Sequence, residues 1–77
     1  MRRNRCEIHI STVTVEGQEV RTFGLVVEGP EGRVTVADIS TNEAEVAALC
    51  ARLNRADLSP LHLRDVVEDW FSEKGIG

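Results

Sequence analysis

The sequence has little that could cross-link its fold or carry it through a membrane. Among its 77 residues only two are cysteines and only three are aromatic. No apolar run approaches the ~20 residues that a membrane-spanning helix needs, and no apolar segment follows the basic residues 1–5, so we expect no signal peptide. We therefore expect a cytoplasmic protein in which Cys6 and Cys50 are reduced and packed in the core. A disulfide between them would need an oxidising compartment.

Basic residues are also scarce. The chain has thirteen acidic and nine basic residues, for a net charge of −4, which argues against general nucleic-acid binding because that function needs a basic footprint. Only Arg2, Arg3 and Arg5 form a locally basic segment. Such arms near a chain end more often promote solubility than bind a partner.

The length predicts one domain over residues 1–77. We expect a flexible arm at 1–4, a sheet at 5–39 and a helical hairpin at 40–74. A chain this short buries only about 60–65% of the surface that its unfolded form exposes, so its own core is marginal. Association is one way to bury more surface, which favours a homodimer or another protein partner.

The first strand is predicted from a period of two in its apolar residues. Cys6, Ile8 and Ile10 alternate with polar residues. The apolar residues then move from even to odd positions, at Val13 and Val15. Either a bulge near residues 11–12 or a strand with apolar side chains on both faces would explain this change. Residues 16–18 contain a glycine and predict a turn.

The second strand is predicted over residues 20–28 and carries apolar side chains on both faces, as a central strand does. One face would hold Phe23, Leu25 and Val27, and the other Val20 and Val26. Gly24 interrupts this strand and indicates a bulge or a close backbone approach.

A third strand follows a turn at residues 29–32, where Pro and Gly occupy positions typical of a type I turn. Val34, Val36 and Ile39 are its apolar residues. The simplest topology is a three-stranded antiparallel meander in the order 1-2-3. With the helices that follow, the fold class is α+β, in the order βββαα, with both helices on one face.

The first helix is predicted to begin with a capping box, in which Ser40 binds the amide of Glu43 and Glu43 reaches back. Its apolar residues recur at i, i+3, i+4 and i+7, which predicts one buried stripe. These residues are Val46, Leu49, Cys50 and Leu53.

The second helix is predicted to begin with Ser59 as N-cap and Pro60 as its first residue, and to end near Gly75. Its apolar face is wide enough to touch both the sheet and the first helix. This face contains Leu63, Val66, Val67, Trp70 and Phe71.

The polar face of the second helix is unusually acidic. Asp65, Asp69 and Glu73 follow one another at intervals of four, with His62 beside them. Like charges at this spacing oppose helix formation by about 0.2–0.5 kcal/mol per pair. A solvated acidic surface is the simpler interpretation. The alternatives are a docking stripe for a basic partner, such as the Arg2, Arg3 and Arg5 arm of the same or another chain, or a ligand corner formed by His62, Asp65 and Asp69.

Neither a metal site nor an active site is predicted. A dedicated metal centre would need more nitrogen or sulfur ligands than this corner offers. The sequence contains no nucleophile elbow, P-loop, Rossmann glycine pattern, CxxC or HExxH. Cys6 and His9 would lie on opposite faces of one strand. We therefore expect a protein that is not an enzyme and needs no cofactor.

One segment resembles a known family. Residues 59–69 read Ser-Pro-Leu-His-Leu-Arg-Asp-Val-Val-Glu-Asp, and further similar positions are residues 23–24, 38–41 and 53–54. With these residues the chain resembles a family of short bacterial proteins defined as a domain of unknown function. The resemblance implies a compact bacterial cytoplasmic protein. It implies no activity, cofactor or catalytic residue.

Two functions therefore remain as hypotheses. The first is an interaction module that self-associates through its open sheet face, where Val20 and Val26 would lie, or through a strand edge, with the arginine arm as a further candidate contact. The second is a small-ligand or metal-responsive regulator that uses the corner of His62, Asp65 and Asp69.

Overall fold

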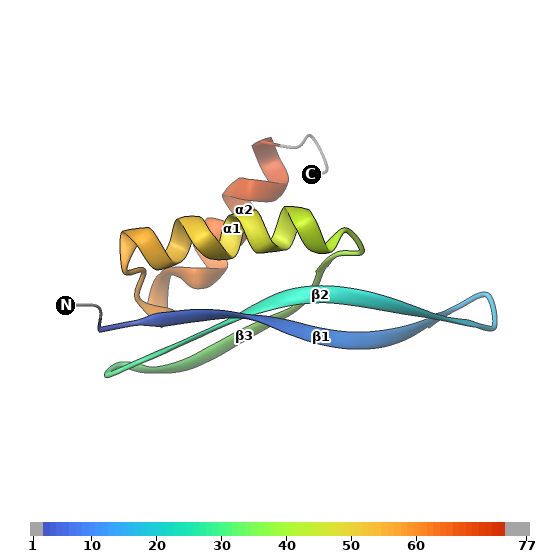
Figure 1. Ribbon diagram of the computed structural model, residues 1–77, viewed down its shortest axis with the longest axis horizontal. Helices are drawn as coiled ribbons and strands as arrows, with labels where there is room; N and C mark the ends of the chain where they lie inside the picture. Colours follow the sequence, from blue (N-terminus) through green and yellow to red (C-terminus); the bar gives the residue numbers. More distant parts are fainter. Residues whose placement is uncertain (1–2, 74–77) are drawn as a thin grey trace.

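The computed structural model describes residues 3–73 as three strands followed by two helices. The strands β1 (Arg5–Val15), β2 (Gln18–Gly29) and β3 (Gly32–Ser40) form an antiparallel sheet in the order β1-β2-β3. The helices α1 (Glu43–Ala56) and α2 (Leu63–Glu73) lie on one face of this sheet (Figure 1), with a short 3-10 turn, η1 (Pro60–His62), before α2. The predicted α+β meander is confirmed. Within the described residues, neither helix is long and apolar enough to cross a bilayer.

Both predicted hairpin turns are present. β1 and β2 are joined by two residues, Glu16 and Gly17, whose φ angles of 51° and 79° are both positive. A turn with two positive φ angles matches the right-handed twist of its strands, and glycine adopts the second position without strain. Pro30 and Glu31 connect β2 to β3.

Of the two explanations for the changed pattern in β1, the bulge near residues 11–12 is wrong. β1 pairs with β2 without interruption, from Arg5 opposite Glu28 to Val15 opposite Gln18. The second interpretation holds, because apolar side chains lie on both faces of β1. Ile10 is on the helix side, opposite Phe23 of the core.

A bulge is present instead in β3, opposite Gly24. Phe23 pairs with Ser40 and Leu25 with Val36, so three residues of β3 face Gly24 alone. A Cβ atom at Gly24 would overlap the Val36 carbonyl oxygen and lie 2.8 Å from the Ala37 Cα. The close backbone approach predicted at Gly24 is therefore confirmed.

The core lies between the helices and the covered face of the sheet. All four residues of the predicted α1 stripe are buried, and α2 contributes Leu63, Val67 and Trp70. The rings of Trp70 and Phe71 meet edge to face, with centroids 5.3 Å apart. This geometry is favourable for aromatic pairs. Thus Trp70 is buried as predicted, whereas Phe71 is half-buried.

The start of α1 differs from the prediction. Asn42, not Ser40, is the N-cap, and its Oδ1 accepts hydrogen bonds from the amides of Ala44 and Glu45. Ser40 still belongs to β3, and its hydroxyl donates to the Glu45 carboxylate at 3.1 Å. The predicted capping box of Ser40 and Glu43 is therefore wrong, and the N-cap lies two residues later. The reason is that β3 includes Ser40 and so ends later than expected.

The start of the second helical segment agrees with the prediction. The Ser59 hydroxyl accepts a hydrogen bond from the Leu61 amide at 3.2 Å, and Pro60 follows at the first position of η1. The regular helix begins only at Leu63.

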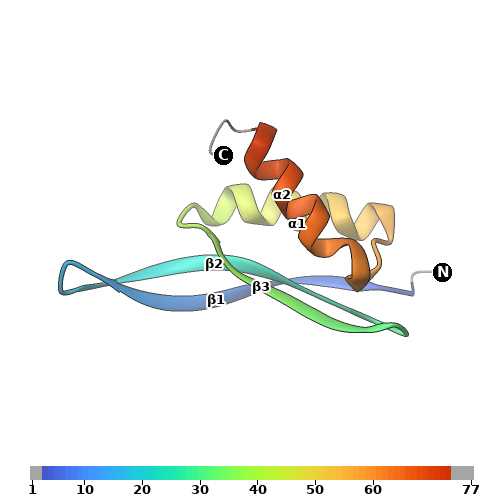
Figure 2. The same cartoon turned by 180° about the vertical axis from the view of Figure 1, so that it is seen from behind.

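The hairpin of β1 and β2 extends well beyond the helices. β3 pairs with β2 only from Phe23 onward, so residues 11–22 form a ribbon of two strands. Figures 1 and 2 show this ribbon projecting past α1, and the molecule is 44 Å long but only 23 Å and 19 Å in its other dimensions. We call residues 11–22 the projecting ribbon.

Candidate functional site

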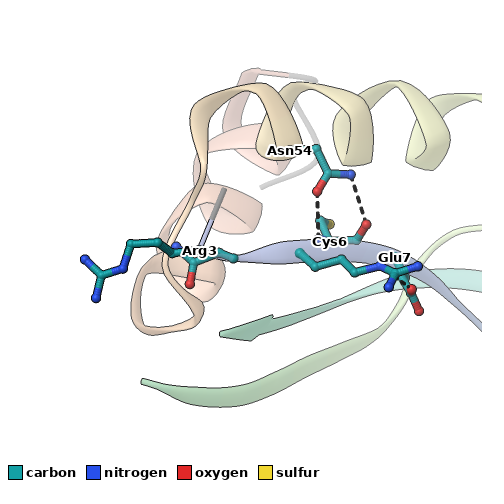
Figure 3. Close-up of a pocket in the computed structure, with 6 residues that line it drawn as sticks. Arg3, Cys6, Glu7 and Asn54 are labelled. Carbon is teal, nitrogen blue, oxygen red and sulfur yellow. Dashed lines mark hydrogen bonds and ion pairs between the residues drawn. The ribbon is translucent and has the colours of Figure 1, made fainter. Parts of the chain in front are cut away.

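The side chain of Asn54 joins helix α1 to the outer edge of β1. The Cys6 amide donates to Asn54 Oδ1 at 2.8 Å, and Asn54 Nδ2 donates to the Cys6 carbonyl oxygen at 3.0 Å (Figure 3). The carboxamide of Asn54 thus binds the backbone as a neighbouring strand would. Both backbone groups of Cys6 must therefore point away from β2.

This contact identifies which backbone groups of β1 face outward. In an antiparallel pair, successive residues alternate between bonding their partner strand and pointing away from it. Because the register with β2 is unbroken, the residues in phase with Cys6 also face outward. These residues are Ile8, Ile10, Thr12 and Thr14.

The outward groups beyond Cys6 form a free edge. Within residues 3–73, no side chain or backbone group outside β1 and β2 forms a hydrogen bond with residues 8–15. Residues 8–15 contain no charge, proline or glycine, and six of the eight are β-branched. Ile10 and Val15 are 55% and 50% exposed. Natural sheet edges are usually protected by charges, proline or bulges, and this segment has none of them.

The opposite edge of the sheet is protected. β3 carries the bulge opposite Gly24, with Asp38 at a positive φ of 56°. Both η1 and α2 contact β3. A regular strand could not extend along this edge past the bulge, so the two edges of the sheet differ in what they can bind.

The beginning of β1 is held by the end of α1. Asp57 Oδ1 accepts hydrogen bonds from the backbone amides of Arg3 and Asn4, at 3.1 and 2.8 Å, and Asn4 Nδ2 donates to the Asp57 carbonyl oxygen. The bond from the Asn4 amide is the main cause that lowers the pKa of the Asp57 carboxyl below its usual range. Of the arm expected at residues 1–4, Arg3 and Asn4 are therefore bound, and residues 1 and 2 lie outside the described part.

A shallow hollow of about 460 Å³ adjoins this contact (Figure 3). It is lined by Arg3, Asn4, Arg5, Cys6, Glu7 and Asn54. The Arg5 guanidinium forms an exposed ion pair with Glu7 at 2.7 Å. The Cys6 thiol offers no nucleophile, because burial and the neighbouring Cys50 raise its pKa above the ordinary range.

Both cysteines are free thiols in the core. Cys50 Sγ donates to the Cys6 carbonyl oxygen at 3.2 Å, so the same carbonyl accepts bonds from Cys50 and Asn54. These contacts tie α1 to β1 beneath the edge. Their arrangement packs α1 against β1.

The predicted acidic stripe lies on the surface, away from the free edge. His62 is exposed in η1, and Asp65, Asp69 and Glu73 are exposed on α2. The described residues contain no cluster of three or more potential metal ligands. Arg5 of the predicted basic arm forms its ion pair with Glu7 and not with the acidic stripe. Ligand binding at His62, Asp65 and Asp69 stays a prediction, and Arg2 lies outside the described residues.

The uncovered face of the sheet offers little apolar surface. Val26 lies there between Glu7 and Thr35, and only 9% of it is exposed. Val20 is half-buried opposite Val13 in the projecting ribbon. The sequence predicted these two valines or a strand edge as the contact, but it did not indicate which edge is free. The uncharged, β-branched run at residues 8–15 was the signal that could have revealed it.

The sequence was compared with curated proteins, solved structures and protein-family models. Neither a curated protein nor a solved structure matches the chain. One family model matches residues 6–73, which include all but the first residue of β1 and every later element. The resemblance noted in the sequence is thus confirmed: the chain belongs to a family of unknown function, DUF6514.

Proposed function

We propose that the protein is a small interaction module whose binding element is the free edge of β1. The observation that carries this proposal is the unpaired backbone of Ile8, Ile10, Thr12 and Thr14 on a strand that projects beyond the helices. An exposed strand edge binds another strand by backbone hydrogen bonds, with specificity from the alternating side chains.

The rest of the chain supports the ribbon and keeps it extended. An isolated two-stranded hairpin is at best marginally stable in water. Here the ribbon continues into a part of the sheet that is covered by helices and fixed by Asn54 and Asp57. A helix-covered base with an unprotected strand edge suits recognition of another strand.

Site-specific photo-crosslinking in cells that naturally express the chain tests this function. A photoreactive residue at Thr14 should give a discrete covalent adduct, whereas the same residue at Glu68 on the exposed side of α2 should give none. The adduct should disappear when Thr12→Pro removes an outward amide, and persist with Thr12→Ala, which keeps it. The Thr12 amide does not bond β2, so proline is compatible with this position. If Thr14 gives no adduct of any mass, the proposal is wrong.

A further inference from the structure

We infer that the strand bound by the free edge of β1 is β1 of a second copy, paired antiparallel about a two-fold axis at Ser11. This inference rests on the proposed function and specifies its partner. The two sheets would then join into one sheet of six strands, with the helices of both copies on the same face.

The register follows from which backbone groups are free. In a symmetric antiparallel pair, outward residues bond to outward residues. Only one register uses all four of them, with Ile8 opposite Thr14 and Ile10 opposite Thr12 of the second copy. At the centre of this register, Ser11 lies opposite Ser11 of the second copy. A shift toward Cys6 would bring the second strand against Asn54, which already occupies both groups of Cys6.

The charges at the two ends of β1 agree with this pairing. Residues 8–15 carry no formal charge, so no like charges meet along the shared edge. At the ends, Arg5 of one copy would lie beside Glu16 in the turn of the other. Both Arg5 and Glu16 are exposed. Because the pair is symmetric, this favourable contact occurs twice, whereas a parallel arrangement would place Arg5 beside Arg5.

Helix α1 leaves room for the second ribbon. Asn54 marks the side of α1 that faces the β1 edge. At 100° per residue, Ala51 and Ala47 lie on the same side, one and two turns before Asn54. Both alanines are exposed. The larger Arg52 lies instead on the side toward α2, where it lines a hollow with Trp70. The strand that joins the edge therefore meets Ala51 and Ala47 beyond Asn54, with Glu43 one turn further along the same side.

Solution mass gives the first test. The wild-type chain should have a mass of about 17 kDa, twice that of the 8.5 kDa monomer, and Thr12→Ala should remain a dimer. Thr12→Pro should be a monomer with an unchanged circular dichroism spectrum, because the β1–β2 bonds are intact. A wild-type chain that stays monomeric up to about 1 mM overturns the inference.

Disulfide trapping tests the register. Facing residues without mutual hydrogen bonds have Cα atoms about 4.5 Å apart, which a disulfide can bridge. Ser11→Cys should therefore cross-link to itself under mild oxidation. His9→Cys alone should not, but a mixture of His9→Cys and Val13→Cys copies should. Cross-linking of His9→Cys to itself would contradict the antiparallel register. The wild-type chain, whose Cys6 and Cys50 are buried, is the control.

The mass of the photo-adduct at Thr14 separates the two proposals. An adduct of two copies supports both. An adduct with a different protein, together with a monomeric wild-type chain, supports the interaction function and overturns the second-copy inference. The absence of any adduct overturns both.

Discussion

Asn54 should contribute measurably to stability, because its side chain replaces a neighbouring strand at Cys6. The Asn54→Ala substitution removes the two hydrogen bonds of 2.8 and 3.0 Å between the carboxamide and the Cys6 backbone. A typical hydrogen bond contributes about 0.5–1.5 kcal/mol net, so the loss should be about 1–3 kcal/mol. That is a substantial part of the total stability of about 4–12 kcal/mol expected for a domain of this size.

Thermal and urea unfolding, monitored by the fluorescence of Trp70, measure this loss of folding free energy. A change of 1 kcal/mol shifts Tm by about 4–8 °C in a domain of this length, so we expect Asn54→Ala to melt about 5–20 °C below wild type. Arg55→Ala is the matched control, since Arg55 is the next residue of α1, exposed, and forms no ion pair within the described residues. It should change stability by less than about 0.5 kcal/mol.

The exchange rate of the Cys6 amide localises the effect. This amide should exchange faster in Asn54→Ala than in Arg55→Ala, because only the former loses the acceptor. Equal stability and equal Cys6 exchange in the two variants would refute the idea that Asn54 closes the end of the β1 edge.

Three further predictions concern the core, the bulge and the anchor of β1. Trp70→Ala should destabilise the fold by about 3–5 kcal/mol, since Trp70 is a buried aromatic side chain of the core; a near wild-type melting temperature would contradict this. Gly24→Ala should destabilise by about 1–3 kcal/mol through overlap with the backbone of β3, and a stability equal to wild type in urea would oppose that reading. The folded-state pKa of Asp57 lies below its ordinary value, so its carboxylate stabilises the fold above the unfolded-state pKa, and this contribution is lost as pH falls through the folded-state pKa. Asp57→Asn should therefore be less stable than wild type at pH 7, and the difference should shrink below about pH 4; a difference independent of pH would contradict the assignment.

The elements could be predicted because their signals are local. The α1 stripe from Val46 to Leu53 lies within two turns of one helix, and the stripe alone shows which face is buried. The turn at Glu16 and Gly17 likewise depends on neighbouring residues. The helix start was misplaced because Ser40 and Asn42 are both good N-caps, and the choice depends on where β3 ends.

The site could not be predicted in the same way, because it depends on residues far apart in the sequence. Asn54 meets Cys6 across 48 positions, and Asp57 meets Asn4 across 53. Neither pair has a local pattern, and only the fold shows that one end of β1 is closed while the other is open. The position of the bulge stayed open in the sequence for a related reason. Gly24 indicated a close approach, but only the pairing shows that β3 supplies the extra residues.

Hydrogen exchange of the outward amides of β1 reports whether this edge pairs with a second copy. Rates would be measured residue by residue at low and high protein concentration. If β1 pairs with a second copy, the amides of Ile8, Ile10, Thr12 and Thr14 should exchange rapidly in dilute solution and slowly in concentrated solution. Those of His9, Ser11 and Val13, which β2 protects, should be slow throughout. Rapid exchange of the Ile10 and Thr12 amides at every concentration would contradict the pairing of β1 with a second copy.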